Sequence, residues 1–208
     1  MHNVVEANYS AIVPGERRRR LLSAAMAVIA ENELENVTMD RIANIAGVAR
    51  VTLYREFGNR AAMIEAVIAY RLVLFDEHFF ANAGDDSDLA SLIQRYLIAS
   101  VRASRTNPVT RRWASGGMRF IYSGSLIHQV SSATWTPVLD RLRKRRGEAN
   151  RMKAEDLALW LTILQYSLGR MVVETGCDDE FVLHLVKLFV SPAMGSQLED
   201  QYNPDTCG

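Results

Sequence analysis

The segment from Val37 to Met63 constrains the fold more than any other part of the chain, because it reads as two short helices joined by a tight turn. Thr38 stands where an N-cap belongs, and apolar residues follow it at i, i+3, i+4 and i+7, as on one face of a short helix. Gly47 can adopt a positive φ without a Cβ clash, which permits a sharp turn. We therefore predict a second short helix over residues 49–57 and a longer helix from Arg60.

The second short helix carries side chains that suit double-stranded DNA. Leu53 and Phe57 are spaced to face inward, which leaves Arg50, Thr52 and Tyr54 to point outward. A guanidinium can donate two hydrogen bonds to O6 and N7 of a guanine in the major groove, and hydroxyls can donate to phosphate oxygens. Two helices with a glycine turn and such an outward face are typical of a DNA-binding helix-turn-helix.

At these residues the chain resembles the tetracycline-repressor (TetR) family of bacterial transcription regulators. The match follows the family's run from Thr38 through IA--AGV to TLYREF and on to a basic residue at position 60, and it covers about the first third of the chain. Ala49 stands where serine is common, Val51 where glycine is common, and Glu56 where the family has an aromatic residue or histidine. Arg60 replaces the usual lysine and keeps its charge, so the class is intact, whereas the operator sequence and phosphate contacts do not carry over.

An arginine run, residues 17–20, opens the amphipathic helix that precedes this segment. Four cations in a first turn oppose the helix dipole, so we expect a nearby polyanion to compensate them, with a solvated charged face as the alternative. The residues expected to contact DNA are Arg17, Arg18, Thr38, Arg50, Val51, Thr52, Tyr54, Arg55, Asn59 and Arg60.

Composition limits the other classes of function. The 208 residues carry a formal net charge of zero, so attraction to DNA must come from local patches. Cys177 and Cys207 match no metal-binding spacing, and no HExxH, GxSxG or phosphate-binding glycine loop is present. The histidines are scattered: His2, His78, His128 and His184. We therefore expect no enzyme activity, cofactor or metal, and, since no apolar run could span a bilayer, a soluble cytoplasmic protein.

Apolar periodicity predicts an all-α fold throughout. We expect an N-terminal arm and three-helix helix-turn-helix DNA-binding domain over residues 1–60, and a helical effector-binding and dimerisation domain over residues 61–208. In the second part the spacing predicts helices over 60–80, 88–104, 109–114, 154–175 and 179–190. It also predicts a weak helix over 118–130 and a separate helix that starts at Trp135 and runs into a basic stretch.

The middle of the chain is rich in aromatic and methionine side chains, which could line an apolar pocket or simply pack a core. Our pocket hypothesis includes Trp113, Met118, Phe120, Tyr122, His128, Trp135, Trp160, Tyr166 and Met171, with Arg119 as a further polar candidate. The family resemblance implies that a small effector binds in this region.

The last two predicted helices are apolar nearly all round, which one chain of this size cannot easily cover. We expect two such helices from each of two chains to form a four-helix bundle, as the resemblance also implies, with an internal hairpin as the alternative. The residues expected at this interface are Leu161, Leu164, Leu168, Val172, Leu185 and Phe189.

The leading functional hypothesis is a homodimeric, ligand-responsive repressor that releases operator DNA when a small apolar or aromatic molecule binds. The alternative is a helical small-molecule-binding protein or enzyme whose helix-turn-helix is only a packing unit. A steep salt dependence of binding to duplex DNA would separate the two.

Overall fold

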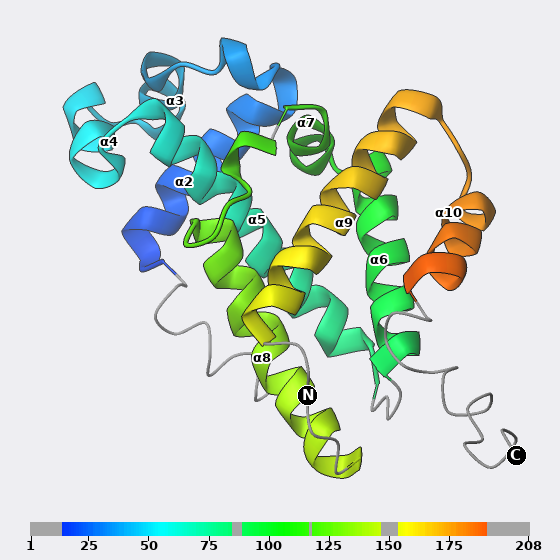
Figure 1. The fold of residues 1–208 in the computed structure, drawn as a ribbon. Coiled ribbons are helices and arrows are strands. Elements are labelled where there is room, and N and C mark those ends of the chain that lie inside the picture. Colours follow the sequence, from blue (N-terminus) through cyan, green and yellow to red (C-terminus); the bar gives the residue numbers. More distant parts are fainter. Residues whose placement is uncertain (1–13, 85–88, 117, 147–153, 191–208) are drawn as a thin grey trace, which may run out of the picture.

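The computed structural model describes residues 14–84, 89–116, 118–146 and 154–190 (Figure 1). Helices make up the regular structure of these residues, and no strand is found among them, which confirms the all-α prediction. None of the helices in these ranges combines the length and apolar character that crossing a membrane requires.

The N-terminal part contains the predicted helix-turn-helix. Its elements are α2 (Glu16–Glu31), the 3₁₀ turn η1 (Leu34–Asn36), α3 (Met39–Ala46), α4 (Arg50–Phe57) and α5 (Arg60–Asn82). The Oγ1 atom of Thr38 accepts a hydrogen bond from the Arg41 amide at 3.3 Å, and Asn59 Oδ1 accepts one from the Ala62 amide at 2.9 Å. Gly47 ends α3 in the left-handed region, with φ 65° and ψ 35°. The predicted caps and turn are therefore confirmed.

One apolar core runs from α2 through α3 and α4 into the first half of α5. α2 contributes a buried stripe at helical spacing, Ile42 and Leu53 bury against it from the two short helices, and Met63 and Val67 complete it from α5. Because α5 packs against α2 and α4 and also against α7 and α8, defined below, it belongs to both parts of the molecule. The domain boundary predicted at residue 60 falls at the start of this shared helix and stays a prediction.

The C-terminal part is a set of packed helices (Figure 1). Its elements are α6 (Leu89–Thr106), α7 (Pro108–Gly116), the 3₁₀ turn η2 (Met118–Phe120), α8 (Leu126–Arg146), α9 (Ala154–Thr175), α10 (Asp179–Leu185) and η3 (Val186–Val190), a π-helical turn that continues α10. α9 packs against α6, α7 and α8, and α10 packs against α6. Asp178 caps α10 through a 2.8 Å hydrogen bond that its carboxylate accepts from the Phe181 amide.

The prediction of separate helices over 118–130 and from Trp135 is wrong. Gly124 adopts φ 86°, a conformation that residues with a Cβ rarely adopt, so a turn interrupts the first segment. The Ser125 hydroxyl accepts a hydrogen bond from the His128 amide at 3.1 Å, and α8 then runs without a break past Trp135 and Pro137. Apolar periodicity alone did not reveal where this helix begins.

A polar group lies inside the aromatic core of the C-terminal part. Asp76 of α5 is fully buried, and its carboxylate accepts hydrogen bonds from the Tyr96 hydroxyl at 2.7 Å and the Thr134 hydroxyl at 2.6 Å. The Tyr96 ring meets the Trp135 ring edge to face at 4.9 Å. Because buried carboxylates require partners, this arrangement fixes α5, α6 and α8 against one another.

Gly169 sets the separation of α6 and α9. A Cβ at this position would lie 2.7 Å from Ser104 Oγ and 3.5 Å from Ser104 Cβ. We expect Gly169→Ala to lower the free energy of unfolding by about 1–3 kcal/mol through overpacking, offset in part by a gain of about 1 kcal/mol in helix propensity.

A double-mutant cycle measured by urea unfolding isolates this contact. Ser104→Ala removes the colliding Oγ and leaves an ordinary contact, so Gly169→Ala should be neutral or stabilising in that background. Equal effects of Gly169→Ala in both backgrounds would show that Ser104 does not set the spacing.

Candidate functional site

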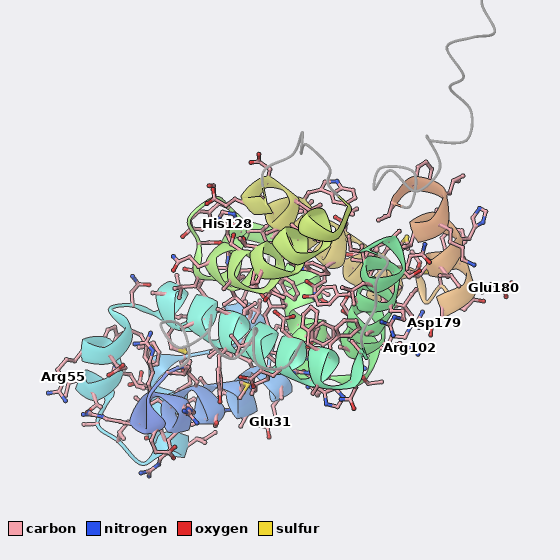
Figure 2. The ribbon with its side chains drawn as sticks, turned by 90° about the horizontal axis from the view of Figure 1, so that it is seen from below. Glu31, Arg55, Arg102, His128, Asp179 and Glu180 are labelled. Carbon is pink, nitrogen blue, oxygen red and sulfur yellow. The ribbon has the colours of Figure 1, made fainter. Side chains whose placement is uncertain are left out.

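The exposed face of α4 is the first candidate site. Leu53 and Phe57 are buried beneath the helix, and the opposite face presents Val51, which is 71% exposed, together with Tyr54 and Arg55. Figure 2 shows Arg55 at one extremity of the molecule, far from Arg102 and Asp179 on α6 and α10. α4 therefore projects where a large, rigid partner can reach it.

Arg50 is held in place before any partner binds. Its guanidinium lies 3.0 Å from the Asp40 carboxylate, donates a 3.0 Å hydrogen bond to the Tyr54 hydroxyl, and stacks 5.2 Å from the centroid of the Tyr54 ring. The hydrogen bond to Tyr54 and the charge of Asp40 raise the pKa of Arg50 above its usual value. Arg50 is thus a fixed cation at the start of α4, and Asp40 is its competing partner.

Arg18, predicted as a DNA contact, is engaged within the protein. Its guanidinium donates to the Glu56 carboxylate at 2.8 Å and to the Glu56 carbonyl at 3.2 Å, and it lies 4.6 Å from the centroid of the Phe57 ring. Arg18 therefore fastens α2 to the end of α4 and neutralises the anion that Glu56 brings to this face. Arg17, by contrast, is exposed to solvent.

The other predicted contacts divide in the same way. Thr38 and Asn59 are exposed and serve as the caps described above, and Thr52 is half-buried. The Arg60 guanidinium donates to the backbone carbonyls of Val37 and Leu34, so it joins the start of α5 to the loop before α3. Contacts of all these residues with DNA stay predictions.

Two exposed residues of α3 were missed. Ile45 is 51% exposed, and Asp40 faces Arg50. The exposure of Ile45 could have been predicted from the sequence, because position 45 does not belong to the apolar face predicted for this helix. The pairing of Asp40 with Arg50 depends on the angle between two helices, which the sequence does not state.

A cavity in the C-terminal part is the second candidate site. It measures about 20 Å³, and α5, α6, α7 and α9 surround it. Its lining consists of Ile68, Arg71, Leu72, Phe75, Ser100, Ala103, Val109, Thr110, Trp113 and Gln165. Of these lining residues, the pocket hypothesis included Trp113. The sequence analysis did not single out the others as pocket residues.

The remaining pocket candidates lie elsewhere. Met118 and Tyr122 are exposed, whereas Phe120 is buried. The Arg119 guanidinium lies over the Phe120 ring, 4.9 Å from the centroid of that ring. His128 accepts a 3.0 Å hydrogen bond from the Gly124 amide, and its Nε2 lies 3.4 Å from the Glu155 carbonyl at the start of α9 (Figure 2). Trp135 belongs to the aromatic core around Tyr96.

Three further candidates lie on α9. Tyr166 is buried with its ring 5.9 Å from that of Trp113, while Trp160 and Met171 are half-buried. No cluster of histidine, cysteine, aspartate or glutamate suited to a metal ion occurs within the described ranges.

The residues expected at a dimer interface differ in exposure. Leu161 and Val172 are buried within the single chain, and Leu164, Leu168 and Leu185 are half-buried. Phe189 is 65% exposed, and three other large apolar side chains on the last three helical elements are also exposed: Ile163, Phe181 and Leu188. An apolar surface on α9, α10 and η3 is thus left uncovered.

α7 connects the cavity to the helix-turn-helix. Val109, Thr110 and Trp113 of α7 line the cavity, and the next turn packs against α2 and η1. Arg112 forms an ion pair with Glu33, and Arg119, just after α7, lies 3.7 Å from Glu35. Both carboxylates belong to the connection between α2 and α3.

The engagement of Arg18 leads to a stability prediction. We expect Arg18→Met to lower the free energy of unfolding by about 1 kcal/mol, because it removes a partly exposed ion pair and a cation–π contact. Arg17→Met is the matched control and should leave stability unchanged, as measured by chemical denaturation. Equal stabilities of the two variants would mean that Arg18 does not fasten α2 to α4.

Comparisons with known proteins agree with this architecture. Residues 21–67 match the family model described as bacterial regulatory proteins, tetR family. The nucleoid occlusion factor SlmA of Actinobacillus pleuropneumoniae is 26% identical over 102 residues, 49% of this chain and 50% of that protein. The DNA-binding transcriptional repressor TetR of Mycobacteroides abscessus is 29% identical over 79 residues, 38% of this chain and 42% of that protein. The chain thus matches about half the length of these relatives or less.

The fold likeness extends further than the sequence likeness. The crystal structure of a TetR transcriptional regulator from Rhodococcus sp. RHA1 superposes with a TM-score of 0.62 at 20% identity, covering 88% of this chain and 96% of that one. This match includes the C-terminal helices, which the family model does not reach. Residues 21–67 thus match the tetR family of bacterial regulatory proteins in sequence, and the described helices share the fold of a solved TetR transcriptional regulator.

Proposed function

We propose that the protein is a transcription regulator that binds operator DNA as a homodimer and releases it when a small apolar or aromatic molecule binds in the C-terminal part. The observation that carries the proposal is the exposed face of α4, where Arg50, Val51 and Tyr54 project from a buried scaffold. A helix with such a face fits the major groove, where arginine reads guanine and an apolar side chain can contact a thymine methyl group.

The partner of this face follows from its charge. With zero net charge on the chain, electrostatic attraction to DNA comes from the exposed cations on and beside α4, among them Arg17, Arg50 and Arg55. The N-termini of α3 and α5 add backbone amides and positive dipole ends for phosphates. The binding constant should fall steeply with salt as phosphate counterions are released.

Control by a ligand requires a link between the two parts, and two helices supply it. α5 runs from the helix-turn-helix core past the cavity, and α7 carries part of the cavity wall and contacts α2 and η1. A ligand that prefers one arrangement of α7 shifts the population toward it and changes the placement of the two α4 helices in a dimer. The change in operator affinity equals the ligand's preference between the two states.

The Arg50 contact gives the direct test. Once bound fragments have been selected from genomic DNA, Arg50→Ala should weaken binding to the selected site about 5- to 150-fold and relax its preference at one base pair. Its affinity for random duplex DNA should change much less. The measurement is fluorescence anisotropy at two salt concentrations with both DNAs.

Arg170→Ala is the matched control, because Arg170 is an exposed arginine on α9 paired with Glu174 at 2.8 Å, away from α4. It should bind both DNAs like the parent protein. An equal loss on selected and random DNA for Arg50→Ala would make Arg50 a phosphate contact. Salt-independent or undetectable binding by the parent protein would reject the function itself.

The dimer has its own test. Phe189→Glu and Leu188→Glu should each raise the dimer dissociation constant at least about 100-fold, since a charge buried in an apolar interface costs several kcal/mol. Met118→Glu changes another exposed apolar residue, on η2, and should leave the dimer intact. Sedimentation equilibrium measures all three, and a monomeric parent protein at micromolar concentration would rule out the interface.

A further inference from the structure

Arg71 on α5 is a cation that no carboxylate of the described residues pairs with. It is half-buried, it lines the cavity, and its Nε atom is wholly enclosed. Within the described residues no oxygen accepts a hydrogen bond from its Nε. Other arginines with comparable burial are paired: Arg18 with Glu56, Arg105 with Asp179, and Arg112 with Glu33.

Its surroundings disfavour the charge. Burial lowers the pKa of Arg71 from its usual value, and no neighbouring carboxylate opposes the effect. A guanidinium nitrogen that is enclosed without a partner loses hydration and does not regain it as a hydrogen bond. An anion placed in the cavity would supply the missing interaction.

A second donor in the same cavity wall is also unused. Trp113 is 6% exposed, and its Nε1 atom is buried without a hydrogen-bond partner. The two hydroxyls that line the cavity donate elsewhere, because Ser100 donates to the Leu97 carbonyl at 2.8 Å and Thr110 to the Asn107 side chain at 3.2 Å. The donors left for a ligand are therefore few, and one of them is charged.

Apart from the buried amide of Gln165, the rest of the lining is apolar: Ile68, Leu72, Phe75, Ala103 and Val109. A carboxylate carries one negative charge, which the single cation of this wall can balance, whereas a phosphate dianion would leave a second negative charge unpaired among apolar side chains. We propose that the effector is a carboxylic acid with an apolar or aromatic body, its carboxylate paired with Arg71 and hydrogen-bonded by Trp113. This inference rests on the proposed function and specifies the class of molecule that controls it.

Entry of such a molecule must move a wall of the cavity. The volume of about 20 Å³ holds roughly one water molecule. Trp113 and Val109 both lie on α7, so an acid that enters against Arg71 presses on the helix whose Arg112 is paired with Glu33. The charged end of the ligand and the route to the helix-turn-helix thus meet at α7.

The test compares acids with their amides. The full-length protein is titrated, at constant ionic strength, with benzoate and with straight-chain acids from hexanoate to dodecanoate, each beside its neutral amide. Tryptophan fluorescence and the melting temperature report binding. At least one acid should bind at least 10-fold more tightly than its amide, and inorganic phosphate should not bind the cavity.

Variants assign the preference to the two donors. Arg71→Met should abolish the preference for acid over amide, Arg71→Lys should retain part of it, and Trp113→Phe should weaken the acid about 3- to 10-fold. Arg170→Met, which removes an exposed arginine of α9, should behave like the parent protein. Arg71→Met should also raise the melting temperature of the unliganded protein, because it removes a half-buried cation whose Nε has no partner, whereas a purely structural arginine would lower it.

The outcomes separate this inference from the proposed function. Equal binding of acids and amides, an acid preference that survives in Arg71→Met, or no binding of any acid overturns the carboxylate assignment. Operator binding is measured independently, so a protein that binds DNA but shows none of these preferences remains a regulator with another effector. If an acid binds through Arg71 but the protein has no affinity for DNA, the proposed regulatory function is rejected and the carboxylate site is supported.

Discussion

The packing of α5 along its whole length is the constraint on which the rest of the structure depends. Its first turns complete the core of the helix-turn-helix, its middle carries Arg71 into the cavity, and its last turns carry Asp76 to the hydroxyls of Tyr96 and Thr134. A helix buried on several sides cannot shift at one end alone, because close-packed side chains transmit displacement. The two parts of the molecule therefore share one rigid element, and α7 is the shorter second connection between them.

The helix-turn-helix could be predicted from the sequence because its signals are local. The Thr38 and Asn59 caps and the left-handed Gly47 each depend on a few neighbouring residues, and all three were found where expected. The start of α8 could not be predicted, because a positive φ at Gly124 overrides the apolar pattern around it. The cavity could not be predicted for another reason. Nothing in the sequence distinguishes Arg71 from other arginines on helices, and only the packing of four helices shows that its Nε has no partner among the described residues.

The contacts of Glu56 and Arg60 explain how the protein accommodates two departures from the family pattern near α4. Glu56 would bring a negative charge close to phosphates, but Arg18 neutralises it and stacks on Phe57. The cost of one substitution is thus met by a residue 38 positions earlier in the chain. Arg60 keeps the charge of the lysine it replaces, yet its planar guanidinium reaches two backbone carbonyls at once. Arg18 thus supports the end of α4, and Arg60 holds the start of α5 against the segment before α3.

The pairing of Asp40 with Arg50 has a consequence for discrimination. A free arginine on a surface samples many rotamers, and a ligand must order it, whereas Arg50 is already ordered by Asp40 and by the ring of Tyr54. In the proposed regulator, a base would have to displace this carboxylate, so the net energy of the contact would be the difference between the two partners of Arg50. A base edge that binds Arg50 more weakly than Asp40 does would leave the arginine in place, and Asp40 would thereby set the threshold that a correct sequence must exceed.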